Sequence, residues 1–166
     1  NIKLKAELWV NYSSNHLILD STIISNTGIF SLELRTPPDS VLMPIMFPQD
    51  TQCVVNVTVN PSGTRTSSNL NLNLYNDSES VGHIYRSNYV RDSLVPGQFF
   101  VFDYYFESNL TIFGTVVCTY GSFIDSSIYD LYSPTGWNKH VRHFTSYSNN
   151  GSTSSISTNE PEGGKW

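Results

Sequence analysis

The stretch Asn69-Leu70-Asn71-Leu72-Asn73-Leu74-Tyr75 alternates polar and apolar residues without interruption. Successive side chains of a β-strand point to opposite faces, so this period of two puts every leucine on one face and every asparagine on the other. The stretch therefore predicts a strand in a sheet that buries one face and leaves the other in contact with water.

Other stretches along the whole chain also have the composition of β-strands. β-branched and aromatic residues fill short runs bounded by Gly, Pro, Asn and Ser, and no stretch carries apolar residues at helical spacing for three turns. The runs expected to form strands are 3–10, 16–25, 28–35, 53–60, 70–75, 99–107, 110–120 and 144–147, with a short strand within 83–92. Short strands without intervening helices predict an all-β fold, an antiparallel β-sandwich or jelly roll with long loops.

Turn signals predict which strands pair. Gly28 follows the run 16–25 and accepts the positive φ of a tight turn, so 16–25 and 28–35 are expected to form a hairpin. The runs 53–60 and 70–75 are expected to pair antiparallel across a polar loop.

Composition also predicts two central strands and one irregular connection. The runs 99–107 and 110–120 are dense in Phe, Tyr, Val and Ile and are joined by a short turn at Ser108 and Asn109, so they are expected to be central strands. Four prolines between residues 36 and 50 predict a long irregular connection there, because proline removes ladder donors.

The chain is expected to hold one domain. Its 166 residues suffice for one core. We expect a β-sandwich head over residues 1–147 and a polar tail over residues 148–166, since the tail has too few apolar residues to order itself. A neighbouring subunit is the simplest support for an ordered tail. Because the chain begins at Asn1 without Met, we expect it to be cut from a larger parent.

The charge balance and the length of the apolar runs argue against two classes of partner. Charged residues make up 14% of the chain, with nine Lys and Arg and a net charge of -5. Nucleic-acid binding draws its affinity from clustered cations, so nucleic acid is not an expected partner. Membrane insertion is not expected either, since the apolar runs are far shorter than a membrane span.

Two cysteines, Cys53 and Cys118, both lie in runs expected to be strands. They are too few for a disulfide framework and lack the paired spacing of a zinc site. We expect each to be a small buried side chain, and a single bridge between them is the alternative.

Signals for catalysis are weak. The chain has four histidines, and His140 and His143 lie on a basic segment that makes a poor metal site. Asp125 and Asp130 are acidic residues that could flank a glycosidic bond, but their spacing is unspecific. We therefore expect no catalytic residues, no metal and no cofactor.

Signals for binding are better. Aromatic rings with amides and hydroxyls recognise sugars and protein loops, and two loop-like segments concentrate them. The alternative is that these rings cover the open ends of the sandwich. Arginine also binds a carboxylate such as that of sialic acid through two parallel hydrogen bonds. The candidate ligand-binding residues are Tyr85, Arg86, Asn88, Tyr89 and Arg91 in one segment, and Tyr129, Tyr132, Trp137, Asn138 and Arg142 in the other.

The first third of the chain resembles a known family. Glu7-Leu8-Trp9-Val10 is followed by a polar loop, the run 16–25, a Gly-containing turn and the run 29–35. This order is similar to the receptor-binding heads of viral attachment fibres, especially adenovirus-like ones. The aromatic C-terminal strand of that family is replaced here by the polar tail.

The resemblance implies a location and a function. It implies a homotrimer of sandwiches on a virion surface or in the extracellular space, binding a host cell-surface glycan, including a sialylated one, or a protein receptor. Two other classes share the composition. One is a secreted jelly-roll ligand of the tumour necrosis factor or C1q type. The other is a carbohydrate-active or esterase sandwich enzyme, which needs a cleft with a perturbed carboxylate or a His-paired serine.

Overall fold

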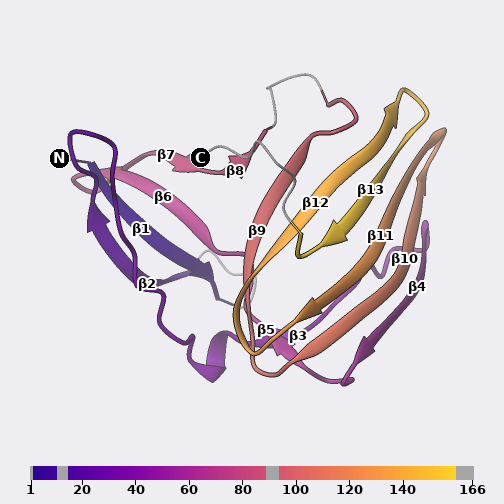
Figure 1. Ribbon diagram of the computed structural model, residues 1–166, viewed down its shortest axis with the longest axis horizontal. Coiled ribbons are helices and arrows are strands. Elements are labelled where there is room, and N and C mark those ends of the chain that lie inside the picture. The colour runs from indigo at the N-terminus through magenta and orange to yellow at the C-terminus, as the bar shows by residue number, and fades with distance from the viewer. Residues whose placement is uncertain (1, 11–14, 89–93, 160–166) are drawn as a thin grey trace.

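The computed structural model describes residues 2–10, 15–88 and 94–159, and these residues confirm the all-β prediction (Figure 1). They form thirteen strands and one short 3₁₀ helix, Asp39–Val41. The strands are β1 (Ile2–Trp9), β2 (His16–Ile23), β3 (Met43–Pro44), β4 (Cys53–Asn60), β5 (Arg65–Thr66), β6 (Asn71–Asn76), β7 (Glu79–Ile84), β8 (Arg86–Ser87), β9 (Phe99–Phe106), β10 (Leu110–Tyr120), β11 (Phe123–Ser133), β12 (Gly136–Ser148) and β13 (Gly151–Ser157).

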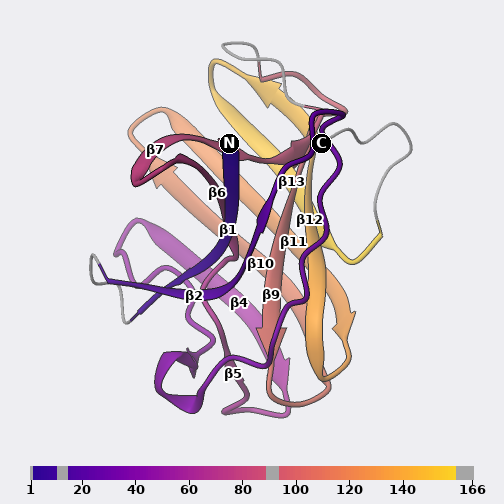
Figure 2. The same ribbon diagram turned by 90° about the vertical axis from the view of Figure 1, so that its left-hand side faces the viewer.

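The strands form two sheets in a curled, sandwich-like arrangement. The smaller sheet has the order β2-β1-β6-β7, and the larger has the order β3-β5-β9-β12-β13-β11-β10-β4, with β8 also paired to β9. In Figure 1 the smaller sheet lies beside the β9 end of the larger one, and Figure 2 shows it in front of the long strands. All pairings are antiparallel except that of β11 with β13.

Three two-residue turns set the register of the sheets. They are Asp77-Ser78 between β6 and β7, Gly121-Ser122 between β10 and β11, and Asn149-Asn150 between β12 and β13. Asp77 and Gly121 have φ values of 55° and 62°. Positive φ gives a two-residue turn the twist of the strands it joins, so Asp and Gly suit these places.

Two apolar clusters make up much of the core of the described residues. In β1, Leu4, Ala6 and Leu8 are 0% exposed, as the alternation of this strand predicts. Ala6 and Leu8 belong to a cluster that Trp137 of β12 packs against, so the first cluster joins the two sheets. The second cluster lies on the larger sheet and comprises Phe106, Leu110, Ile112 and Leu131, with Ile45 and Phe47 packed over it.

The predicted hairpin of 16–25 with 28–35 is wrong. The turn itself exists, since Gly28 has φ 80° and its N–H donates to the Ser25 carbonyl at 2.9 Å. None of the residues 28–35 belongs to a strand, however, and β2 pairs with β1 instead. β2 pairs with β1 because β1 is a buried strand, and a local turn signal carries no information about a strand elsewhere in the sequence.

The predicted pairing of 53–60 with 70–75 is also wrong. β4 pairs with β10, and β6 pairs with β1 and β7 in the other sheet. β9 and β10 are interior strands, but they do not pair with each other across the turn that joins them. The sequence reports that these runs are strands, whereas their partners depend on contacts between distant segments.

The polar tail orders itself in part. Gly151–Ser157 is β13, an interior strand between β12 and β11, so the expectation that residues after Ser148 cannot order within their own chain is wrong. Ser152 and Ser154 are buried there. A serine is small enough to be enclosed by neighbouring strands, and its hydroxyl is then satisfied by a hydrogen bond. The segment expected as 144–147 is the end of the longer strand β12.

Cys53 and Cys118 form a disulfide, so the expectation of two free buried thiols is wrong. The two residues face each other in the ladder between β4 and β10. The bridge thus fastens the edge strand β4 to the interior of the larger sheet.

Candidate binding site

One face of the larger sheet, here named the pocket face, carries an open pocket of about 450 Å³. Its floor comes from alternate residues of five strands, because a strand sends every second side chain to the same face. The opposite wall comes from residues 43–47 and 66–69. The floor residues are Phe102, Tyr104 and Phe106 of β9, Ile112 of β10, Tyr129 of β11, His140 and Arg142 of β12, and Ile156 of β13.

Aromatic rings dominate the pocket. The Tyr129 ring meets the Phe47 ring edge to face, with centroids 5.5 Å apart. Burial raises the pKa of Tyr129, so its hydroxyl stays protonated at neutral pH and can donate a hydrogen bond. The pocket therefore offers flat apolar surfaces with a polar group at their rim, an arrangement typical of small-ligand sites.

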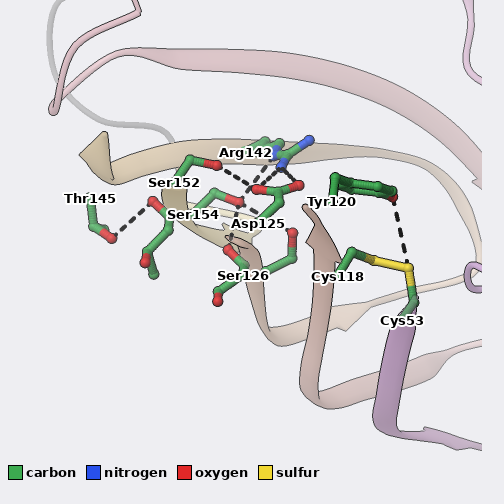
Figure 3. Close-up of polar contacts among 11 residues, drawn as sticks. Cys53, Cys118, Tyr120, Asp125, Ser126, Arg142, Thr145, Ser152 and Ser154 are labelled. Carbon is green, nitrogen blue, oxygen red and sulfur yellow. Dashed lines mark hydrogen bonds and ion pairs between the residues drawn. A yellow bond between two sulfur atoms is a disulfide. The ribbon is translucent and has the colours of Figure 1, made fainter. Parts of the chain in front are cut away.

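A polar cluster extends from the pocket along the same face (Figure 3). Arg142 Nη2 donates to Asp125 Oδ2 at 3.1 Å and Oδ1 at 3.3 Å, and Arg142 Nε donates to Ser154 Oγ at 3.0 Å. The Ser152 hydroxyl also donates to Asp125. We call Asp125, Arg142, Ser152 and Ser154 the Asp–Arg cluster.

Two members of the Asp–Arg cluster are open to a ligand. The side chains of Arg142 and Asp125 are 31% and 29% exposed, whereas both serines are buried beneath them. The Arg142 guanidinium also lies over the Phe144 ring, 5.0 Å from its centroid. Solvent-facing hydrogen-bonding groups are thus held in place by β11, β12 and β13.

His140 in the pocket floor is paired with a serine. Its Nε2 lies 2.9 Å from Ser133 Oγ, and its ring stacks on Phe106 with centroids 5.2 Å apart. Burial lowers the pKa of His140 to about 4, so the ring is neutral at physiological pH. Ser133 is 0% exposed. Its hydroxyl cannot reach a substrate, and the pair satisfies two buried polar groups.

The first predicted patch lies outside the lining of the pocket. Tyr85 is exposed between β7 and β8, and Arg86 lies in β8; both line a much smaller hollow of about 40 Å³. The Asn88 side chain accepts from the Phe99 N–H at 2.7 Å and donates to the Gly97 carbonyl at 3.0 Å, so it braces the backbone. Tyr89 and Arg91 lie outside the described residues.

The second predicted patch is divided between the two faces of the sheet. It was expected in a loop, but it lies in β11 and β12, where neighbouring residues point in opposite directions. Arg142 and Tyr129 line the pocket, whereas Tyr132 is exposed on the opposite face of β11.

Trp137 and Asn138 have structural partners. Trp137 Nε1 donates to the Arg35 carbonyl at 3.1 Å, and its ring packs against the first apolar cluster. Asn138 Nδ2 donates to the carbonyls of Pro134 and Gly136 at 2.6 Å and 2.9 Å, which closes the turn before β12.

The same alternation separates the two pairs considered for catalysis. Asp125 lies on the pocket face, whereas Asp130 lies five residues along β11 and therefore on the opposite face, so they cannot flank one bond. His140 and His143 are likewise on opposite faces of β12. Among residues 2–10, 15–88 and 94–159, no group of three or more His, Cys, Asp or Glu side chains could hold a metal ion.

Sequence reasoning missed Ser152, Ser154 and Tyr104 and did not connect Asp125 with Arg142. The serines were assigned to a tail, and a 17-residue separation gives no local signal that joins an aspartate to an arginine. Assignment of β11, β12 and β13 as strands would have placed these residues on one face.

Comparisons with known proteins give no relative. No protein-family model matches the chain, and no match was found among curated proteins or among solved structures. In the part of the chain that the structure describes, no helix is long and apolar enough to cross a membrane.

Proposed function

We propose that this chain is the receptor-binding head of a viral attachment spike or fibre and that it binds a cell-surface glycan on the pocket face without changing it chemically. One observation carries the proposal. The aromatic pocket of about 450 Å³ adjoins the partly exposed Asp–Arg cluster, so rings and hydrogen-bonding groups meet at one site. A sugar needs both, because its C–H faces pack on rings and its hydroxyls need donors and acceptors.

The enzyme alternative has less support. The His-paired serine that an esterase needs is Ser133, and its hydroxyl is enclosed. The protein-receptor alternative would use the same exposed rings and is an outcome of the experiment below. A secreted jelly-roll ligand could have the same sheets as a viral head, so only the identity of its receptor would distinguish the two.

Two tyrosines of β11 test the site. Tyr129 faces the pocket, whereas Tyr132, three residues along, faces away. We expect the wild-type protein to bind members of a glycan array, Tyr129→Ala to lose that binding, and Tyr132→Ala to retain it. Thermal unfolding of each variant verifies that it is folded. Loss of binding in Tyr132→Ala alone would place the site on the other face, and the absence of any bound glycan would favour a protein receptor.

The proposal includes assembly as a homotrimer on the virion surface, which the family resemblance implies. The opposite face of the larger sheet has several exposed apolar side chains among Thr, Asn and Ser, and it supports contact between copies. This outer face includes Val54 of β4, Phe113 of β10, and Ile124, Ile128 and Tyr132 of β11. Asp130 is its only charged residue among the described parts of these three strands.

A further inference from the structure

We infer that the pocket selects neutral sugars over acidic ones, with Asp125 and Arg142 together holding two adjacent hydroxyls of the ligand. This inference rests on the proposed glycan-binding function and specifies its ligand class. It also departs from the expectation that Arg142 binds the carboxylate of a sialic acid.

The charge of Arg142 is already compensated. Its Nη2 contacts both carboxylate oxygens of Asp125, and its Nε is bonded to Ser154. Among the described residues that line the pocket, Arg142 is the only one with a permanent charge. Asp125 lies beside Arg142 on the pocket face but outside the lining of the pocket, so the pocket and the Asp–Arg cluster together present an ion pair of zero net charge to a ligand.

An acidic ligand would meet an unfavourable neighbour. A carboxylate that approached the Arg142 guanidinium would lie close to the Asp125 carboxylate, and like charges repel strongly in a partly dehydrated site. The electrostatics at Tyr129 agree with this balance, because Arg142 lowers the pKa of its hydroxyl whereas Asp125 raises it. The net charge of -5 on the chain gives an anion no compensating attraction.

Hydroxyl groups match the pair better. A carboxylate accepts hydrogen bonds and a guanidinium donates them, whereas each sugar hydroxyl can do both. Two neighbouring hydroxyls can therefore bond to Asp125 and to the outer edge of Arg142 without breaking the ion pair. The ring of Tyr129 lines the same pocket, so the apolar face of the sugar has a surface to pack on.

The experiment compares neutral oligosaccharides with the same oligosaccharides capped by sialic acid, using titration calorimetry on the full chain. We expect the wild type to bind the neutral member of each pair at least about tenfold more tightly. Asp125→Asn keeps the shape of the side chain and removes its charge, which frees the Arg142 charge. We expect it to reduce the preference by about tenfold or to reverse it.

Glu107→Gln is the matched control. It breaks a second arginine–carboxylate pair, Arg65 with Glu107, whose atoms are 2.6 Å apart and whose side chains are 36% and 28% exposed. Neither residue lines the pocket. We expect the ratio of affinities for neutral and acidic sugars to stay at its wild-type value.

The salt dependence of binding gives a second readout. Binding of a neutral sugar to a zero-charge site should change little between low and high ionic strength, whereas binding of an anion to a free arginine should weaken. Tighter, salt-sensitive binding of sialylated sugars by the wild type, lost in Arg142→Gln, would overturn the inference and leave the proposed function standing. Failure of both sugar classes to bind would overturn both.

Discussion

His140 carries the clearest pH dependence of a single residue. It is buried in the pocket floor, and burial lowers its pKa to about 4, below the ordinary value of 6.5. Between these values the unfolded chain binds a proton that the folded protein does not, so stability is full above pH 6.5 and falls as the pH drops toward 4. We expect His140 to account for a loss of about 3 kcal/mol across this window.

Replacement of the histidine isolates its contribution from those of the carboxylates. His140→Gln retains a polar group that can bond to Ser133 Oγ but removes the titration. Urea unfolding at a series of pH values should give a shallower decline between pH 6.5 and 4 for this variant than for the wild type. Parallel curves for the two proteins would mean that His140 has the same pKa in the folded and unfolded states.

The sequence predicts some residues of the binding site, but it does not predict which residues lie beside them in space. The sequence indicated Arg142 and Tyr129, both of which line the pocket, because an arginine and a tyrosine in a polar segment are typical of binding surfaces. It grouped them with Tyr132 and Trp137, which point elsewhere, because the segment was interpreted as a loop. In a strand, odd-numbered and even-numbered residues point to opposite faces. A segment interpreted as a loop gives no such rule, so the sequence could not separate these residues by face.

At the scale of elements, Gly114 shows how closely β10 and β4 approach. Its φ is 138°, and a β-carbon there would overlap the Asn56 carbonyl and lie 2.7 Å from Val57 Cα. Both atoms are backbone of the neighbouring strand, so the clash cannot be relieved by a side-chain rotation. We expect Gly114→Ala to lower the free energy of unfolding by about 2–4 kcal/mol, measured by urea unfolding.

Gly82 in β7 is the control for this substitution. A β-carbon at Gly82 would meet only Leu74 Cδ1, at 3.8 Å, which is an ordinary contact. Gly82→Ala should leave stability within about 1 kcal/mol of the wild type. Equal effects at the two glycines would contradict the close approach of β10 to β4.

The disulfide makes a separate contribution to the same pair of strands. Cys53 and Cys118 are separated by 65 residues, and a cross-link that closes a long loop restricts the unfolded chain. We expect the double variant Cys53→Ser, Cys118→Ser to lose about 2–4 kcal/mol of unfolding free energy in urea. Reduced wild type should unfold at the same urea concentration as the double variant, and a difference between them would point to an effect of the serines themselves.

The existence of most strands could be predicted, but their partners could not. The alternation in β1 and β6 and the apolar runs of β9 and β10 are local signals of strand formation. β13 lacks such a signal because it consists largely of serine and threonine, and it becomes a strand through pairing on both sides with β11 and β12. The position of β13 therefore depends on its two neighbouring strands and cannot be predicted from its own residues.

At the scale of the whole molecule, the larger sheet has two faces of different character. The pocket face carries the Asp–Arg cluster and the aromatic floor, while the outer face presents Val54, Phe113 and Ile128 to solvent. These exposed apolar side chains stand among uncharged polar ones on neighbouring strands, a composition that suits contact with another protein surface. The two faces therefore differ in the way that our proposal requires, with ligand binding proposed on one and contact between copies on the other.

The outer face gives the last prediction, which concerns assembly. A net charge of -5 opposes the approach of a second copy, but on this face Asp130 is the sole charged residue among the described parts of β4, β10 and β11. Apolar residues on three adjacent strands can then meet those of another copy with little like-charge repulsion. We expect light scattering to give a mass that is a multiple of 18.7 kDa, three copies being the number that the family resemblance implies.

Charge placed in the middle of this face should separate the copies. Phe113→Asp places a second carboxylate beside Asp130, its ladder neighbour in β11, so the measured mass should fall to that of one chain at micromolar concentration. Tyr85→Asp is the control, since Tyr85 is about as exposed but lies between β7 and β8, away from the outer face. The contact is expected to depend on apolar burial across β4, β10 and β11 alone. A wild type that stays monomeric at every concentration would therefore show that copies do not meet through this face. A Tyr85 variant that dissociates as readily as the Phe113 variant would show the same.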